Sequence, residues 1–438
     1  MTATPLPQSD TQTQDRTPLA QQGPEELQAL LDSVRSEYDA LHERGLQHDL
    51  TRGKPSTQQL DLSADLLRLP STHLDRSGTD TRNYGGLQGL AELRELFAPL
   101  LGVPADQIVA GGNSSLSMMR DCLVDLILFG GPDSEHPWRE EQEIKFVCPV
   151  PGYDRHFSLL ESLGIEMITV PLNDDGPDVD AVRAIVTDDP SVKGIWVVPT
   201  YANPSGAVCS PQVAAELAAM PAAAPDFKIF WDNAYALHHL TDEQVDTADV
   251  LGVAAEAGNP HRPLLFASTS KITFAGAGVA FLAGSTDNVA WYLQHLSKGS
   301  IGPDKVNQLR HVEFFGDSDG VLAHMHQHRE IIAPKFAEVQ RILGERLGGL
   351  GIAEWTDPAG GYFVSLDVGE GLASRTVQLA KEIGIALTPA GSSYPLGQDP
   401  QDHNLRLAPT YPSLGEVSEA MDAVAVCVLL ATLEKLTR

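Results

Sequence analysis

Apolar residues recur with helical spacing near both ends of the chain. Between positions 25 and about 44 they fall every three or four residues and place Leu27, Leu30, Leu31 and Val34 on one face. This pattern predicts an amphipathic helix that buries one side. The last segment, GEVSEAMDAVAVCVLLATLEKL, has the same character. We therefore expect one helix near each end of the chain.

Between these helices the pattern changes to alternating short β-rich runs and helical segments, from about Gln107 to Ala283. Such alternation is typical of a parallel α/β sheet. A turn-rich stretch precedes it, and a long helical pattern with shorter mixed elements follows about Asp319. We expect a large α/β domain and a smaller α+β domain. The expected parts are a disordered tail, an N-terminal segment of the small domain, the large domain and the small C-terminal domain, over 1–24, 25–75, 76–320 and 321–438.

Four of the β-rich runs end on a polar or aromatic residue whose side chain could bind a ligand or take part in catalysis. KFVCPVPGY ends at Tyr153, GIWVVPTYANPSG runs out at Asn203, KIFWDNAY reaches Asp232, and LLFASTSK stops at Lys271. Ligands of open α/β sheets bind in the crevice outside the carboxyl ends of the strands. Each residue alone has an ordinary structural explanation, such as a helix cap or a surface lysine. Together they predict one shared crevice.

A fifth run, QIVAGGNSSLSMMRDCLVDLILFG, joins a short strand to a helix through glycines and small hydroxyl residues. The helix opens near Gly112, Asn113 and Ser114. Free N–H groups and the positive end of the helix dipole suit an anion such as phosphate. A glycine turn followed by a serine N-cap explains the same residues. Taken by itself, this motif leaves both interpretations open.

Composition narrows the choice of partners. Acidic residues outnumber basic ones by 59 to 30 in 438 residues, so the net charge is −29. This charge argues against nucleic acid and anionic membranes as partners. No uncharged apolar run is long enough to span a bilayer, and the N-terminus has no secretory apolar region. The four cysteines lack metal-site spacing and indicate reduced thiols in a cytoplasmic protein.

The motif HxHxH, formed by His324, His326 and His328, is the one pattern that suggests a metal. On the helix expected there, His326 points away from the other two rings. No carboxylate or cysteine completes a ligand set. We therefore expect no metal site.

Pyridoxal phosphate is a ligand that would use all of these groups. It needs a lysine amine, a buried carboxylate, an aromatic ring to stack on and an anion-binding site in one crevice. Its aldehyde forms a Schiff base with a lysine. Its ring nitrogen needs a carboxylate to stay protonated, so that the ring can accept electrons. Lys271, Asp232, Tyr153 and the start of the helix near Ser114 supply these groups.

The sequence also resembles a known family on eight motifs: DLTRGKP (49–55), NYGGLQG (83–89), GGNSSLSMM (111–119), PGYDRHF (151–157), NPSG (203–206), DNAY (232–235), STSK (268–271) and NLRLAPTYPS (404–413). In this order they resemble the class I aminotransferases, which are fold-type I pyridoxal-phosphate enzymes, and most of all the aspartate aminotransferase subgroup Ic. The resemblance covers nearly the whole chain after the tail. It implies a mostly parallel sheet of seven-stranded type in the large domain.

The resemblance also implies roles around the cofactor. Lys271 would form the Schiff base and shuttle the proton, Asp232 would pair with the ring nitrogen, and Tyr235 would hydrogen-bond the ring oxygen. The other residues expected to hold the cofactor are Gly112, Asn113, Ser114, Tyr153, His156, Asn203 and Ser268, together with Tyr84 reaching from a neighbouring subunit. A homodimer is therefore expected.

For the substrate, the resemblance implies that Arg406 grips the α-carboxylate and that Gly53 lets an N-terminal loop close over it. Asn203 would contact substrate as well as cofactor. Arg52 and Lys54, which flank Gly53, are candidates for reading a distal carboxylate.

The sequence departs from the family at one position. Most class I enzymes carry an arginine eight residues after the lysine, where it grips the phosphate, but this chain has Val279. Lys305 and Arg310 are the candidates for a replacement cation. Otherwise the phosphate charge rests on N–H groups and the helix dipole.

The expected function is transfer of an amino group from an L-amino acid, aspartate first, to a 2-oxo acid, 2-oxoglutarate first, with ping-pong kinetics. An aminotransferase for aromatic residues, alanine or aminoadipate stays open. So does a β-lyase or decarboxylase on the same fold. A non-catalytic regulator is disfavoured, because such proteins carry a DNA-binding domain for which the N-terminal segment is too short and too acidic.

Overall fold

The computed structural model describes residues 16–245 and 247–438. The chain forms two compact units. Among the described residues, the first unit holds 16–56, Pro204–Gly206 and Ile332–Arg438, and the second unit holds Thr57–Asn203 and Ala207–Ile331. These boundaries differ from the positions 75 and 320 expected from the sequence.

The difference has a physical reason. Residues that follow Ser56 hydrogen-bond to the first half of a long helix, α11 (Ser318–Leu347), and both segments thereby belong to the second unit.

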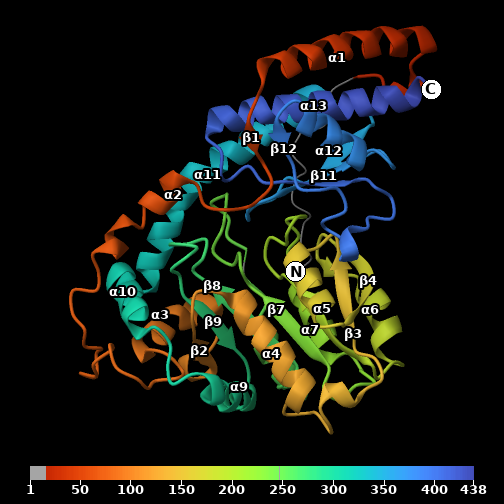
Figure 1. Cartoon of the computed structure of the whole chain (residues 1–438). Helices are drawn as coiled ribbons and strands as arrows, with labels where there is room; N and C mark the ends of the chain where they lie inside the picture. The colour runs from red at the N-terminus through yellow and green to blue at the C-terminus, as the bar shows by residue number, and fades with distance from the viewer. Residues whose placement is uncertain (1–15, 246) are drawn as a thin grey trace. The chain divides into compact units, whose positions relative to one another are not determined.

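The second unit is built on one large sheet. Its strand order is β2-β9-β8-β7-β6-β3-β4-β5, and Figure 1 shows β7, β8, β9 and β2 side by side. Neighbours from β8 through β4 pair in parallel, whereas the pairs of β9 and the β4–β5 pair are antiparallel. The strands are β2 (Ile108–Ala110), β3 (Lys145–Val150), β4 (Glu166–Asn173), β5 (Gly176–Pro177), β6 (Val192–Val197), β7 (Lys228–Asp232), β8 (Pro263–Ser268) and β9 (Ala280–Ala283). The mostly parallel α/β sheet expected from the sequence is confirmed; in the described residues it has eight strands.

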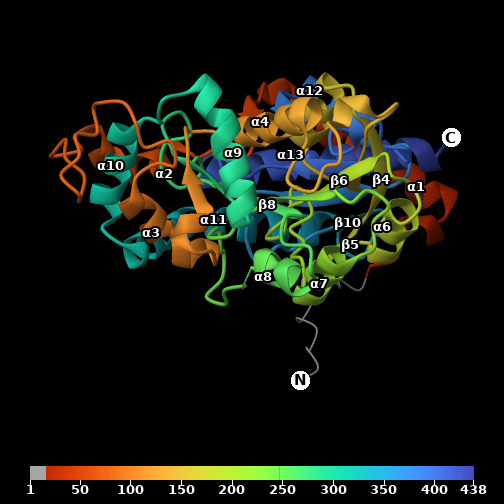
Figure 2. The ribbon, with the colours of Figure 1, turned by 90° about the horizontal axis from the view of Figure 1, so that it is seen from below.

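Helices cover both faces of this sheet. The helices of the second unit are α2 (Thr57–Asp61), α3 (Ala91–Leu101), α4 (Ser115–Phe129), α5 (Asp154–Ser162), α6 (Val179–Val186), α7 (Pro211–Ala219), α8 (Val250–Glu256), α9 (Thr286–Gly299) and α10 (Lys305–Phe315), with short 3₁₀ turns at 64–67, 105–107 and 138–140. One hydrophobic core joins α3, α6, α7, α8 and α10 to one face, and a second core joins α4, α5 and α9 to the other. Figure 2 shows α4 on one side of the strands and α7 and α8 on the other.

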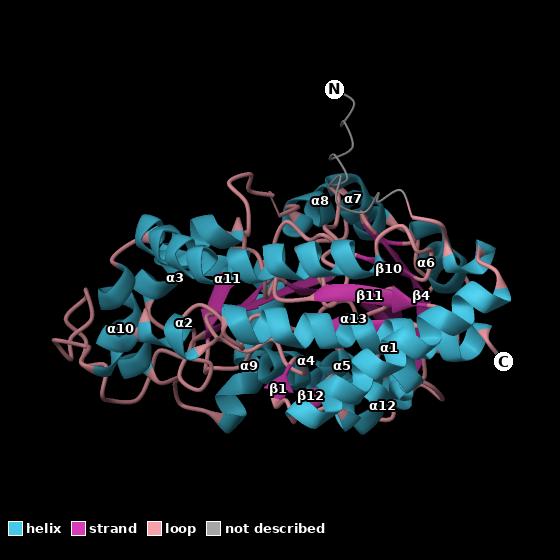
Figure 3. Ribbon diagram, turned by 90° about the horizontal axis from the view of Figure 1, so that it is seen from above, coloured by secondary structure: helices cyan, strands magenta, loops and turns pink. Residues whose placement is uncertain are grey.

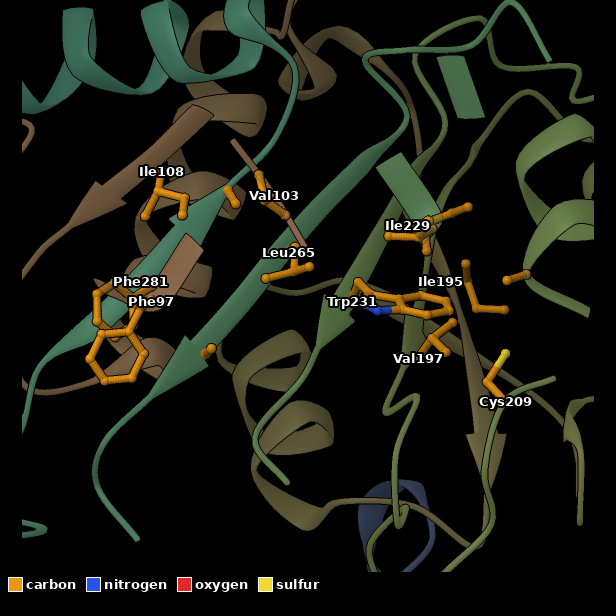
Figure 4. Close-up of a cluster of buried hydrophobic side chains, with 14 of the residues drawn as sticks. Phe97, Val103, Ile108, Ile195, Val197, Cys209, Ile229, Trp231, Leu265 and Phe281 are labelled. Atoms are coloured by element: carbon orange, nitrogen blue, oxygen red, sulfur yellow. The ribbon is translucent and has the colours of Figure 1, made fainter. Parts of the chain in front are cut away.

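The alternation of side chains along each strand explains the two cores. In β7, Ile229 and Trp231 enter one core while Phe230 enters the other. Leu265 of β8 lies in the same core as Ile229 and Trp231, and Figure 4 shows these side chains together. Successive residues of a strand point to opposite faces, so a strand buried on both faces reads as a continuous apolar run. The polar residues that function requires are therefore left to the strand ends.

The first unit contains two long helices and small sheets. Its elements are a 3₁₀ turn (Leu19–Gln21), α1 (Pro24–Arg44), β1 (His48–Asp49), β10 (Ala353–Trp355), β11 (Val364–Val368), α12 (Ala373–Glu382), β12 (Ile385–Ala386), a 3₁₀ turn (Pro395–Gly397), β13 (Asn404–Leu407) and α13 (Leu414–Leu436). Strands β10, β11 and β13 form an antiparallel sheet, and β1 pairs with β12 in parallel. Helix α1 runs beside α13 (Figure 3). The helices predicted near both ends are confirmed.

Residues 1–15 of the expected disordered tail lie outside the described part of the chain. The remainder of that tail is ordered, which corrects the expectation for it. Leu19 is fully buried, and its N–H donates to the carbonyl of Leu350 at 3.0 Å. One buried leucine within a polar segment is sufficient to fix the backbone there. The overall composition of the segment did not reveal this. None of the helices in the described residues has both the length and the hydropathy that a membrane span requires.

Candidate active site

The four predicted strand ends lie around one cavity of the second unit, at the carboxyl edge of its sheet. The cavity has an empty volume of ≈ 720 Å³, which includes its opening to solvent. The predicted residues that line it are Ser114, Tyr153, Asn203, Asp232, Tyr235, Ser268 and Lys271. Ser115, Leu116, Met119, Val198, Ala234 and Ser270 complete the lining. The shared crevice inferred from the strand ends is thus present.

Asp232 is the last residue of β7 and lies at the bottom of this cavity with only 4% exposure. Its Oδ2 is 2.9 Å from Nε2 of His156, a buried ring on α5. That ring stacks on Trp196 of β6 at 4.1 Å between centroids and 6° between planes. Oδ1 of Asp232 is buried and has no hydrogen-bond partner among the described residues. A buried carboxylate oxygen without a partner is costly, so this atom calls for a donor in the cavity.

Tyr153 ends the β3 loop and sits at the N-cap position of α5. The edge of its ring meets His156 at a centroid distance of 4.9 Å. Burial raises the pKa of its hydroxyl to about 12, although the positive charge of Lys271 opposes this rise. The phenol is therefore neutral at physiological pH and offers a flat apolar face to a ligand ring.

Asn203 follows β6 and is almost fully buried, with 2% exposure. Its Oδ1, like that of Asp232, has no hydrogen-bond partner among the described residues. Two residues earlier, Tyr201 adopts a φ of 51°, which side-chain-bearing residues rarely do. Its hydroxyl lies 2.7 Å from Nδ1 of His239. The loop that presents Asn203 is thus held in a strained conformation, which is common beside functional sites.

Lys271 lies in a single helical turn that follows β8. Its Nζ lies over the ring of Tyr235 at 4.6 Å from the centroid. The hydroxyl of Ser268 donates to Ser270, whose own hydroxyl donates to the carbonyl of Asn113 at 3.1 Å. These bonds connect the lysine turn to the loop before α4.

The start of α4, where the sequence predicts that the phosphate binds, lies beside the cavity. Ser114 is the N-cap and accepts from the N–H of Ser117 at 3.2 Å. The amide of Asn113 donates to the carbonyl of Gly276 at 3.2 Å. The carbonyl of Gly112 accepts from Ala280 of β9. The loop is therefore fixed by the sheet, with the N-terminal end of a 15-residue helix directed at the cavity.

The two candidate cations for the phosphate are engaged elsewhere. Nζ of Lys305 donates to the carbonyls of Asn83 and Gly85, at 2.8 and 2.6 Å. Arg310 donates from Nε to the carbonyl of Leu69 at 2.9 Å. Lys305 thereby supports the loop that bears Tyr84, whose side chain is 79% exposed. Val279 itself is buried among core residues.

The expected substrate residues Arg406, Gly53, Lys54 and Arg52 belong to the first unit. The guanidinium of Arg406, on β13, lies 5.2 Å from the centroid of Phe363. Gly53 lies on the same ring, because a Cβ there would come within 2.5 Å of it. Nζ of Lys54 lies 3.8 Å above the ring of Tyr411 and 3.8 Å from Oδ2 of Asp49. Arg52 is exposed.

The sequence missed several residues around Lys271. His238, whose sequence context is unremarkable, is buried beside the lysine, and burial together with the lysine's charge lowers its pKa to about 3. His324 and His328, considered only as metal ligands, lie on α11 against the same turn.

In the described residues no three His, Cys, Asp or Glu groups form a metal-binding set. His326 points outward to Arg329 and Glu330, as helical spacing predicted.

Comparison with known proteins then identifies the family. The family model described as aspartate amino-transferase matches residues 22–438. The chain belongs to this family. The resemblance inferred from the motifs is confirmed, and with it the fold-type I architecture, the aminotransferase activity and the pyridoxal-phosphate cofactor of the family.

The relatives are close. The chain is 59% identical to a protein of Mycolicibacterium smegmatis over 94% of this chain and 98% of the other. It is 54% identical to the aspartate aminotransferase of Corynebacterium glutamicum, over 92% of this chain and 94% of that one. The crystal structure of an aspartate transaminase from Corynebacterium glutamicum superposes with a TM-score of 0.92 at 53% identity, covering 94% of this chain and 97% of the other.

Proposed function

We propose that this aminotransferase moves the amino group of L-aspartate to 2-oxoglutarate. The observation that supports its cofactor most directly is the buried Oδ1 of Asp232, which lacks a partner among the described residues in a cavity that also presents Lys271. A protonated ring nitrogen would satisfy that oxygen. The unpartnered Oδ1 of Asn203 fits a second polar group of the ring in the same way.

Bound pyridoxal phosphate supplies an aldehyde that condenses with amines and a protonated ring that accepts electrons. Asp232, oriented by the hydrogen bond from His156, would hold the proton on the ring nitrogen. Nζ of Lys271 would remove the proton from Cα of the amino acid and return it to C4′, the carbon of the cofactor's aldehyde group. Tyr153 would pack on the ring face. Tyr235, whose ring lies 4.6 Å from Nζ of Lys271, would orient the amine and hydrogen-bond the ring oxygen.

The phosphate is assigned to the N-terminal end of α4, with Gly112, Asn113 and Ser114, and to the hydroxyl of Ser268. The positive end of a long helix and free N–H groups favour an anion there. Ser268 and Ser270 both line this cavity and are hydrogen-bonded to each other.

The substrate assignment rests on the relatives and on the first unit. The 54% identical relative is named aspartate aminotransferase. Arg406 suits a bidentate contact with the α-carboxylate. Gly53 and Arg406 lie on the same aromatic ring, so the loop of Arg52 and Lys54 belongs to the substrate-binding region. One of these two cations reads the distal carboxylate.

The proposal extends to assembly and compartment. Exposed Tyr84, on a loop held by Lys305, is available to reach the phosphate site of a second copy, which makes the active form a homodimer. All four cysteines are free and buried, which fits the reducing cytoplasm.

The first test is the absorption spectrum of the purified protein with pyridoxal phosphate, before and after L-aspartate is added without any oxo acid. The visible band should give way to that of the aminated cofactor, with oxaloacetate released in equal amount. Ammonia or carbon dioxide in place of oxaloacetate would refute transamination in favour of a lyase or decarboxylase. Lys271→Ala should bind the cofactor yet show no change of this kind.

The distal-carboxylate assignment is tested by Lys54→Ala and Arg52→Ala. Loss of one charged hydrogen bond should lower kcat/KM for aspartate roughly 10- to 100-fold. The value for alanine, which lacks the distal carboxylate, should change little. Equal losses for both amino acids would contradict the assignment.

A further inference from the structure

The turn that carries Lys271 is held internally by its own backbone. The N–H of Thr269 donates to Val279 at 2.8 Å, and the N–H of Thr273 donates to the carbonyl of Thr269 at 2.8 Å. One isolated helical turn leaves its last carbonyls without helical partners. Ile272, directly after the lysine, contributes such a carbonyl, and Ile272 is itself buried.

Two histidines of α11 converge on that carbonyl. Nε2 of His324 lies 2.8 Å from the oxygen of Ile272, and the backbone of Ile272 also influences the pKa of His328. The two Nε2 atoms are 3.1 Å apart. His324 is 5% exposed and His328 is fully buried.

The hydrogen-bond partners of His328 determine which of its ring nitrogens carries the proton. Gln59 lies with Nε2 at 3.1 Å from Nδ1 of His328, so an amide N–H there makes Nδ1 an acceptor and leaves the proton on Nε2. A carbonyl oxygen has two lone pairs and can accept from both rings. The proton of His328 is thus on the nitrogen that lies 3.1 Å from Nε2 of His324, beside the carbonyl that His324 contacts.

The rings are neutral as well as buried. Burial lowers the pKa of His324, and it lowers the pKa of His328 to about 4. Ser63 adds a hydroxyl at 3.3 Å from Nε2 of His324. The two rings are thus fixed from the side of residues 59–63 and grip the lysine turn on the other side.

We propose that His324 and His328 are positioning residues, whose paired Nε2–H groups hold the carbonyl of Ile272 and thereby fix the direction in which Lys271 projects over Tyr235. The proposal rests on the proposed function of Lys271. Neither histidine touches substrate or cofactor; both act through the turn.

The chain offers a matched set of variants. His324→Phe and His328→Phe keep an aromatic ring and remove the donor, whereas His324→Gln and His328→Gln keep an N–H near the position of Nε2. His326→Phe, on the exposed side of the same helix, is the control. Two properties are measured: amide hydrogen exchange of residues 268–273 in the protein without cofactor, and the visible circular dichroism of the bound cofactor.

The Phe variants should exchange about tenfold faster in residues 268–273, which corresponds to the loss of one buried hydrogen bond. They should also lose much of the visible circular dichroism, and both Gln variants should restore both properties. Exchange equal to that of His326→Phe would overturn the proposal and leave the rings as core packing.

If the Phe variants fail to fold, Gln59→Leu carries the test. It removes the amide that donates to Nδ1 of His328 and thereby keeps the proton of that ring on Nε2. Unchanged exchange in residues 268–273 would then overturn the proposal. If the wild-type protein shows no visible band with pyridoxal phosphate, the proposed function fails, while exchange in the protein without cofactor still decides the role of the histidines.

Discussion

We expect acid to destabilise this protein because buried histidines become protonated. The contribution of a single group can be measured at His311. Its ring is fully buried on α10, with Nδ1 at 2.8 Å from the carbonyl of Asn307 and Nε2 at 3.1 Å from the hydroxyl of Thr273. The Nδ1–H donates to the carbonyl, so Nε2 accepts from Thr273. Protonation of Nε2 would break that bond and bury a charge.

The sign and size of the change in unfolding free energy follow from the pKa of His311. Burial lowers the pKa of His311 from 6.5 to about 4. The unfolded chain therefore binds the proton first, and the stability that His311 contributes is fully present above pH 6.5. It is lost as the pH falls from about 6.5 to about 4. At about 1.4 kcal/mol per pH unit, the total loss is about 3 kcal/mol.

The assay is urea unfolding, monitored by tryptophan fluorescence, at a series of pH values from 7.5 to 4.5. His311→Gln removes the titrating group, so below about pH 6.5 its free energy of unfolding should fall less steeply with acid, by about 1.4 kcal/mol per pH unit. The exposed His326→Gln should keep the wild-type slope. Exchange of the imidazole C2 proton of His311 gives its pKa directly, and a value near 6.5 would refute the reasoning.

Four further outcomes are expected. Asp232→Asn should keep the fold but abolish the conversion of the visible band by aspartate; unimpaired conversion would remove Asp232 from the ring nitrogen. Gly53→Ala should raise KM for aspartate at least tenfold, because its Cβ would lie 2.5 Å from Phe363, and an unchanged KM would show that the loop adapts. Val279→Arg should lower the midpoint of thermal unfolding sharply, since it would bury an unpaired charge; a soluble variant that binds cofactor more tightly would contradict this. Lys305→Met should weaken cofactor binding and dimer formation together, as measured in a titration by ultracentrifugation. If neither is weakened, this lysine supports neither cofactor binding nor the dimer.

Much of the second unit could be predicted from local pattern. Continuous apolar runs such as KIFWD and LLFAS become central parallel strands because both faces of the sheet are covered. Polarity then has to appear where a run stops, and this rule is sufficient to locate Asp232, Asn203 and Lys271 in the sequence. Their convergence follows from parallel pairing, since the carboxyl ends of such strands meet at one edge.

What the sequence could not supply is the set of contacts between segments far apart in the chain. His324 and Ile272 are 52 positions apart, and nothing in either local pattern links them. The HxHxH motif suggested only a metal, because a sequence shows which rings share a helix face but not which backbone they meet. Trp196, which stacks on His156, was hidden for the same reason within an apolar strand.

The replacement of the usual arginine by Val279 becomes intelligible once the lysine turn is seen. The N–H of Val279 donates to Oγ1 of Thr269 at 2.9 Å, and its carbonyl accepts from the N–H of Thr269, so the backbone at this position closes the turn that carries Lys271. The side chain then points into the core, where an arginine could not be solvated. Lys305 binds backbone carbonyls of the Tyr84 loop instead of an anion. Because the net charge of −29 repels a phosphate, the attraction has to be local, and the N–H groups at the start of α4 lie beside the cavity that contains Lys271. Holding a phosphate there would demand a rigid loop, and the hydrogen bonds of Asn113 and Ser270 fix the loop before α4.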